Sequence, residues 1–158
     1  AIQLNIFSKE NTHPKFYFFD SGVARAAAGL IYEEIDNVWR GFAFETYLLH
    51  EIRAYNHYAK KHRELFYYRV SGGSEIDLLV ELKKKTLSQA QQFIGFEFKY
   101  SQKWDRRWST QLIEIQTRCS KIKKLYGIYL GKQILTHDSV TVFPVDIFLK
   151  LLADGEIF

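Results

Sequence analysis

The sequence predicts an α/β protein in which a helix, three consecutive strands, a second helix and a further strand form a mixed central sheet flanked by helices. A long segment with helical periodicity covers residues 41–61. Three apolar runs follow at 64–70, 75–82 and 92–100, separated only by S-G-G-S and a short polar link. Short links between strands favour an antiparallel meander, and an aromatic content of 16% favours sheet.

The first forty residues predict one strand and one short helix. K-F-Y-F-F-D (15–20) is a dense aromatic run that is typical of a buried strand. Ser21 is a plausible N-cap for an Ala-rich helix over 23–28, which Gly29 would close. The longer helix at 41–61 ends in basic residues, which suit the negative end of the helix dipole.

The second half of the chain predicts a helix over 105–119 and a buried strand over 123–131. A further strand is expected at 139–143, followed by a short helix around 145–153. Pro144 stands at the start of that helix and Gly155 just after it, the usual positions for these residues. Repeats and low-complexity segments are lacking, so the sequence favours a single domain over 1–158.

Composition narrows the class of protein. With 158 residues, 47% of them hydrophobic, the chain is large enough to bury its own core. The single Cys119 excludes an internal disulfide and a Cys-based zinc site, so we expect a reducing, cytoplasmic setting. Apolar runs stay well below the ~18 residues of a membrane span, so no membrane partner is expected. The chain has no Met, which predicts a fragment of a longer protein, and its net charge of +4 weakly favours acidic partners.

Charged residues interrupt the strand G-F-E-F-K-Y (95–100) at every second position. Strand alternation places Phe96, Phe98 and Tyr100 on one face and Glu97 with Lys99 on the other. The first face would pack against the core, and the second would carry an acid beside a base. The alternative is that Glu97 and Lys99 keep the wet face of a half-buried strand soluble.

Two further carboxylates stand in unusual places. Glu45 lies within the apolar stripe of the 41–61 helix, where an ionised carboxylate needs a cation, a hydrogen-bond network or a metal. The alternative is that Glu45 lies at the edge of the stripe or forms a structural ion pair with an arginine such as Arg25 or Arg69. Asp77 occupies the middle of a strand although Asp is a poor strand former, which indicates a functional reason for it. The alternative is that Asp77 lies on an exposed face that tolerates a carboxylate.

A helical Glu45, Asp77 on one strand and Glu97 with Lys99 on the next form one arrangement. It resembles that of the PD-(D/E)XK nuclease superfamily, whose restriction-endonuclease-like core has the order α-β-β-β-α-β; the likeness covers about residues 41–131. The resemblance implies that Asp77 and Glu97 hold Mg²⁺ or Mn²⁺, that Lys99 positions or activates the attacking water, and that Glu45 assists. Ile76 stands where the superfamily motif has Pro.

Longer motifs resemble the C-terminal domain of a family of prokaryotic AAA-type ATPases. These are K-F-Y-F-F-D-S-G-V-A-R, G-F-A-F-E-T-Y-L-L-H-E-I, F-Y-Y-R-V-S-G-G-S-E-I-D-L-L-V-E and G-F-E-F-K-Y-S-Q-K-W-D-R-R-W. The resemblance implies an ATPase module upstream in the full-length chain. This sequence lacks G-x-x-x-x-G-K-[ST], so we expect no ATP binding by the fragment itself.

The segment K-W-D-R-R-W (103–108) is a candidate nucleic-acid surface. Lys103, Arg106 and Arg107 could neutralise phosphates while Trp104 stacks on bases, and Trp104 and Trp108 would share a face if the helix starts early enough. The alternative, which the frequent burial of aromatic side chains favours, is that both indoles anchor the core.

The function that the resemblance implies for these residues is metal-dependent hydrolysis of DNA phosphodiester bonds. The expected partners are DNA and the ATPase module, with a second copy of the chain as an open alternative. The competing hypothesis keeps the fold without the chemistry, as a catalytically inactive DNA-binding or assembly module of the ATPase.

Overall fold

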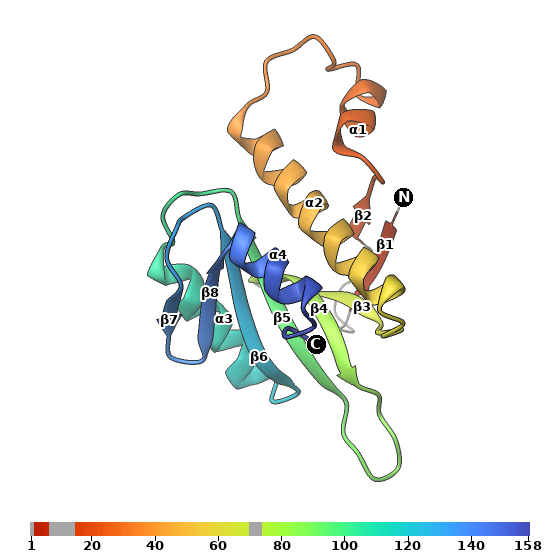
Figure 1. The fold of residues 1–158 in the computed structure, drawn as a ribbon, viewed down its shortest axis with the longest axis vertical. Coiled ribbons are helices and arrows are strands. Elements are labelled where there is room, and N and C mark those ends of the chain that lie inside the picture. Colours follow the sequence, from red (N-terminus) through yellow and green to blue (C-terminus); the bar gives the residue numbers. More distant parts are fainter. Residues whose placement is uncertain (1, 7–14, 70–73) are drawn as a thin grey trace.

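The computed structural model describes residues 2–6, 15–69 and 74–158, and these form an eight-stranded mixed sheet with helices on both faces (Figure 1). The strand order is β2-β1-β3-β4-β5-β6-β8-β7. The strands are β1 (Ile2–Ile6), β2 (Lys15–Tyr17), β3 (Leu65–Arg69), β4 (Glu75–Lys83), β5 (Gln92–Lys99), β6 (Ile122–Tyr129), β7 (Leu135–His137) and β8 (Val140–Pro144). The helices are α1 (Ser21–Ala27), α2 (Asn37–Tyr58), α3 (Arg106–Arg118) and α4 (Val145–Ala153).

The central order α2-β3-β4-β5-α3-β6 confirms the predicted fold class. β3, β4 and β5 form the expected antiparallel meander. α3 carries the chain from β5 to β6, which lies parallel to it, and β8 extends the sheet in parallel beyond β6. The sequence did not reveal β1 or β7, which add one strand near each end of the sheet.

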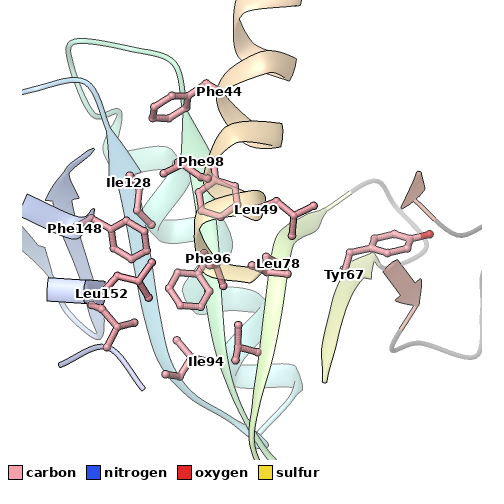
Figure 2. Packing of buried hydrophobic residues seen from close by; sticks show 14 of the residues in the cluster. Phe44, Leu49, Tyr67, Leu78, Ile94, Phe96, Phe98, Ile128, Phe148 and Leu152 are labelled. Atoms are coloured by element: carbon pink, nitrogen blue, oxygen red, sulfur yellow. The ribbon is translucent and has the colours of Figure 1, made fainter. Parts of the chain in front are cut away.

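Two hydrophobic clusters lie on opposite faces of the sheet. α2 and α4 cover one face, where Leu49 and Phe148 belong to the same cluster as the strand residue Phe96 (Figure 2). α3 covers the other face through Leu112 and Ile115. β5 is therefore buried on both faces, which contradicts the alternative that Glu97 and Lys99 only keep a wet face soluble.

The regular alternation predicted for β4 is broken at Asp77. Leu78 and Val80 belong to the cluster under α2 and α4, as alternation requires. Ile76 should share their face, yet it packs with Leu79 in the cluster under α3. The ladder between β4 and β5 likewise stops next to Asp77, at the pair of Leu78 with Phe96. Asp77 thus lies where β4 departs from a regular strand.

The ends of the helices differ from the sequence prediction in detail. The N-cap of α1 is Asp20, whose carboxylate accepts the Val23 N–H, and not Ser21. The strand expected at 15–20 ends at Tyr17, and Phe19 is exposed. The turn expected at 71–74 lies largely outside the described residues. Within the described chain, none of the helices combines the length and apolar character that crossing a bilayer requires.

Trp104 lies flat against β6 at a point that only glycine allows. A Cβ on Gly127 would stand 2.3 Å from the Trp104 ring. The indole N–H donates to the hydroxyl of Ser109, at 2.9 Å. α3 begins at Arg106, so Trp104 precedes the helix, and its ring meets the Trp108 ring edge to face at 5.1 Å. Trp104 is thus a core anchor, as the favoured alternative predicted.

Substitution of Gly127 by Ala should therefore destabilise the protein by about 1–3 kcal/mol, because the new methyl group forces the indole out of its place. Gly41→Ala is the matched control, since nothing lies within 4 Å of a Cβ at this α2 position. That variant should gain roughly 0.5–1 kcal/mol of stability from helix propensity. Urea unfolding of both variants measures the difference, and equal stability of the two would contradict the close approach of Trp104 to Gly127.

Candidate functional site

Two carboxylates are buried side by side in the middle of the sheet. Asp77 and Glu97 are only 6% and 7% exposed. The ladder between β4 and β5 pairs Leu78 with Phe96, and the charge of Glu97 acts on the neighbouring Asp77. One Asp77 oxygen accepts the backbone N–H of Phe98 at 2.8 Å. Within the described residues the Glu97 Oε2 atom is buried without a hydrogen-bond partner. An unsatisfied buried carboxylate oxygen is costly, so this atom is open to a further ligand.

Lys99 completes the acid–base pair that the strand pattern predicted. Its ammonium group lies 2.5 Å from a Glu97 oxygen. The same group lies over the face of the Trp108 ring, 5.6 Å from its centroid, which is a cation–π contact. The Trp104 ring, which packs against β6, contacts the Trp108 ring. Trp104 therefore supports the side chain that holds Lys99 in place.

Glu45 reaches the site from α2 and is held by two side chains of β2. Lys15 Nζ lies 2.9 Å from Glu45 Oε1, and the Tyr17 hydroxyl donates to the same oxygen. Neither Arg25 nor Arg69 is the structural partner that the alternative named. Arg25 instead donates to the Glu33 carbonyl and lies over a tryptophan ring.

Lys15 connects the helical carboxylate with the strand carboxylates. Its ammonium group lies 3.5 Å from Asp77 Oδ1 and 3.8 Å from a Glu75 oxygen. The sequence analysis identified none of Lys15, Tyr17 and Glu75 as site residues. Lys15 and Tyr17 occupy alternate positions of a strand, so a charge within an aromatic run was the available signal.

The carboxylates carry strongly perturbed acidities. Burial, followed by the charges of Glu97 and Glu45, raises the pKa of Asp77 well above its usual value. Burial also raises the pKa of Glu97, although the Lys99 ammonium opposes the change. Both acids are therefore harder to ionise in the folded protein than in water.

The two lysines show the opposite balance. Burial alone would lower the pKa of Lys15, but the carboxylates of Asp77 and Glu45 outweigh it and raise the pKa above its ordinary value. Likewise, burial opposes ionisation of Lys99, while Glu97 and Asp77 raise its pKa. Both ammonium groups stay charged through the neutral range.

The structure thus brings Glu45, Asp77, Glu97 and Lys99 into one interacting group.

The residues of the second predicted surface lie on the adjoining segment around the start of α3. Lys103, Arg106 and Arg107 are exposed there, and Arg107 is paired with Asp105 at 2.5 Å. Trp104 is half-buried against the sheet.

The donor set fits a hard divalent cation with few protein ligands. Among the described residues, no three His, Cys, Asp or Glu side chains are arranged as a metal cage. Mg²⁺ does not need one, because it commonly binds through one or two carboxylates and completes its shell with water and phosphate oxygens. Asp77 and Glu97 offer such a pair, and the Glu97 Oε2 atom has no other partner in the described part of the chain.

Comparison with known proteins gives a family. The model of a family described as "Domain of unknown function (DUF4143)" matches residues 40–148. This range contains Glu45, Asp77, Glu97 and Lys99, whereas Lys15 lies outside it. No curated protein and no solved structure matches the chain.

The raised pKa of Asp77 predicts a pH-dependent effect of Asp77→Asn. A carboxyl group with a raised pKa in the folded state stabilises below its unfolded pKa of about 3.9, and the contribution is lost as pH rises through the folded value. Asn cannot ionise and can still accept the Phe98 N–H. The free energy of unfolding of the variant relative to the wild type should therefore increase from about pH 4 towards neutrality.

Denaturant unfolding at a series of pH values with a chelator present measures this difference. A difference that is constant with pH, or that falls as pH rises, would show that the pKa of Asp77 is not raised in the folded protein.

Proposed function

The chain belongs to the DUF4143 family, and we propose that it is a PD-(D/E)XK-type nuclease-like domain that hydrolyses DNA phosphodiester bonds with a divalent metal ion. The observation that carries the proposal is the pairing of buried Asp77 and Glu97 with Lys99 at the point where β4 leaves the regular ladder. The order α-β-β-β-α-β supports the assignment, because it is that of the superfamily core.

In this proposal Asp77 and Glu97 would hold the ion. The ion, when bound, polarises a phosphoryl oxygen and makes a coordinated water more acidic. Lys99 stands beside Glu97, where its ammonium group orients the attacking water and stabilises the negative charge that develops on the phosphate. The Phe98 N–H fixes Asp77, and the Trp108 ring limits the freedom of Lys99.

We further propose that the domain works as an accessory module of an AAA-type ATPase on the same full-length chain. The proposal is supported by the motifs that resemble the C-terminal domain of those ATPases, which extend from residue 15 to 108. Three of them supply the site residues Glu45, Asp77 and Glu97. In this arrangement the ATPase would move or remodel the DNA that the domain acts on.

The start of α3 offers a DNA-binding surface beside the carboxylates. Arg106 and Lys103 are exposed, and Trp108 connects this segment to Lys99. Cations here would bind the phosphates that flank the scissile bond. Trp104 is not part of this surface, since its ring is committed to the contact with Gly127.

A second candidate is an assembly module without catalysis. The observation that favours it is the set of exposed apolar side chains around α1 and the link to α2, which is unusual for a surface that contacts only water. Tyr32 is 97% exposed and Val38 81% exposed, with Ile31 and Ile35 also above half. Under this hypothesis the buried charges would serve only the structure.

Cleavage assays on linear, branched and single-stranded DNA with Mg²⁺ or Mn²⁺ separate the two candidates. Asp77→Asn, Glu97→Gln and Lys99→Met should each lower the rate by roughly 10²-fold or more, because each removes a charge from the reacting centre.

Glu81→Gln is the matched control. Glu81 is a buried carboxylate of the same strand, 3% exposed, but it is bonded to Gln91 away from the site. Its variant should keep the wild-type rate. Cleavage that survives Asp77→Asn unchanged would assign the activity elsewhere, and a wild type without cleavage on any substrate would favour the assembly module.

The DNA surface predicts a change in salt dependence. Replacing Lys103 and Arg106 together with Gln should weaken DNA binding and reduce the slope of log K against log salt by about 0.9 for each phosphate that the variant no longer neutralises. Lys85→Gln, an exposed cation on the β4–β5 link, is the control and should leave the slope unchanged. Fluorescence anisotropy over a salt series measures the slope. Equal slopes for the wild type and the double variant would remove the start of α3 from the interface.

A further inference from the structure

Lys15 touches carboxylates from two different layers of the fold, the helix α2 and the sheet. It comes from the short strand β2 and contacts Glu45 on α2 as well as Asp77 and Glu75 on β4. Its side chain is 26% exposed, so Lys15 is half-buried among these carboxylates. A buried ammonium group is tolerated only where several negative charges surround it.

The charges of the described site do not balance. The carboxylates of Glu45, Glu75, Asp77 and Glu97 face the ammonium groups of Lys15 and Lys99. With all of these groups ionised, two negative charges remain in excess, which is the charge of one divalent ion. The Glu97 Oε2 atom is buried and has no hydrogen-bond partner in the described structure, and the ion pairs of Lys15 there are with Glu45, Glu75 and Asp77, although its charge also acts on Glu97.

We propose that Lys15 is a built-in cation of the site, which occupies the Glu45 side of Asp77 and limits the site to one divalent ion on the Glu97 side. This inference rests on the proposed metal-dependent function and adds a positioning residue to it. In sites with two metal ions, the second ion neutralises carboxylates and steadies the phosphate. Here the ammonium group of Lys15 takes the place of that second ion.

Two features separate this role from that of an ordinary structural ion pair. The Tyr17 hydroxyl and Lys15 Nζ both bind Glu45 Oε1, so β2 fixes the carboxylate from two points. Lys15 also lies 3.5 Å from Asp77 Oδ1, an oxygen of a proposed metal ligand. An ammonium group at this distance repels any cation that binds the same carboxylate, so its removal must alter metal affinity.

Isothermal titration with Mn²⁺ tests the inference. The wild type should bind one ion. Lys15→Met should bind Mn²⁺ about tenfold or more tightly, or take up a second ion, because the competing charge is gone. Lys15→Arg keeps the charge and should stay close to the wild type. Lys84→Met removes an exposed lysine whose partner Glu64 lies 3.6 Å away, and it controls for a general change in net charge.

Lys15→Met leaves the buried Asp77 and the half-buried Glu45 without this cation and can fail to fold. The comparison of Glu45→Gln with the double variant K15M/E45Q then carries the test, since both lack the Glu45 charge. The double variant should bind Mn²⁺ about tenfold more tightly than Glu45→Gln alone. Equal Mn²⁺ affinity of the wild type and Lys15→Met, or of Glu45→Gln and K15M/E45Q, would overturn the role of Lys15. So would an absence of Mn²⁺ binding by both proteins of a pair.

Failure of the inference can be told from failure of the proposed function. Cleavage of DNA by the wild type together with unchanged Mn²⁺ affinity in Lys15→Met would leave the nuclease standing and remove the built-in cation. Tighter Mn²⁺ binding by Lys15→Met, without cleavage of DNA by the wild type, would establish the built-in cation in a domain that is not a nuclease.

Discussion

The burial of two neighbouring carboxylates in the central sheet is the constraint on which the site depends. Desolvation of an ionised carboxylate costs several kcal/mol, so Asp77 and Glu97 can be charged only where cations and donors surround them. The fold supplies Lys99 from the same strand as Glu97, Lys15 from β2 and the Phe98 N–H from the sheet itself. This supply is incomplete, since both acids keep raised pKa values and one Glu97 oxygen has no partner among the described residues.

The hydrophobic packing of Trp104 and Trp108 supports the same site indirectly. Gly127 leaves room on β6 for the Trp104 ring, and that ring supports Trp108. Trp108 in turn presents its face to the Lys99 ammonium group. A glycine in the sheet thus sets the position of a charged group two aromatic rings away. This explains why an aromatic pair at the start of α3 is structural and yet belongs to the functional region.

Local periodicity was enough to predict the fold class and four members of the charged group. Helical spacing placed Glu45 within an apolar stripe, and strand alternation separated Glu97 and Lys99 from the Phe residues beside them. The same rule failed for β4, where Ile76 changes face, because the Asp77 carboxylate takes the Phe98 N–H in place of a regular ladder. Lys15 could not be found in this way, since β2 reaches the site only through strand pairings that no local pattern encodes.

Lys15 lies outside the matched residues 40–148, on the short strand β2. The way in which β2 is attached to the protein affects the site. β2 is only three residues long and lies at the edge of the sheet, where it pairs with β1 alone. Its contacts with the rest of the protein include the burial of Tyr17 in the cluster under α2 and α4, the contact of Lys15 with the Tyr67 ring, and the bonds of Lys15 and Tyr17 to the carboxylates. Any cation that satisfies Glu45 and Asp77 must therefore weaken the attachment of β2. By linkage, a force that displaces β2 must strengthen the affinity of the carboxylates for cations by the same free energy.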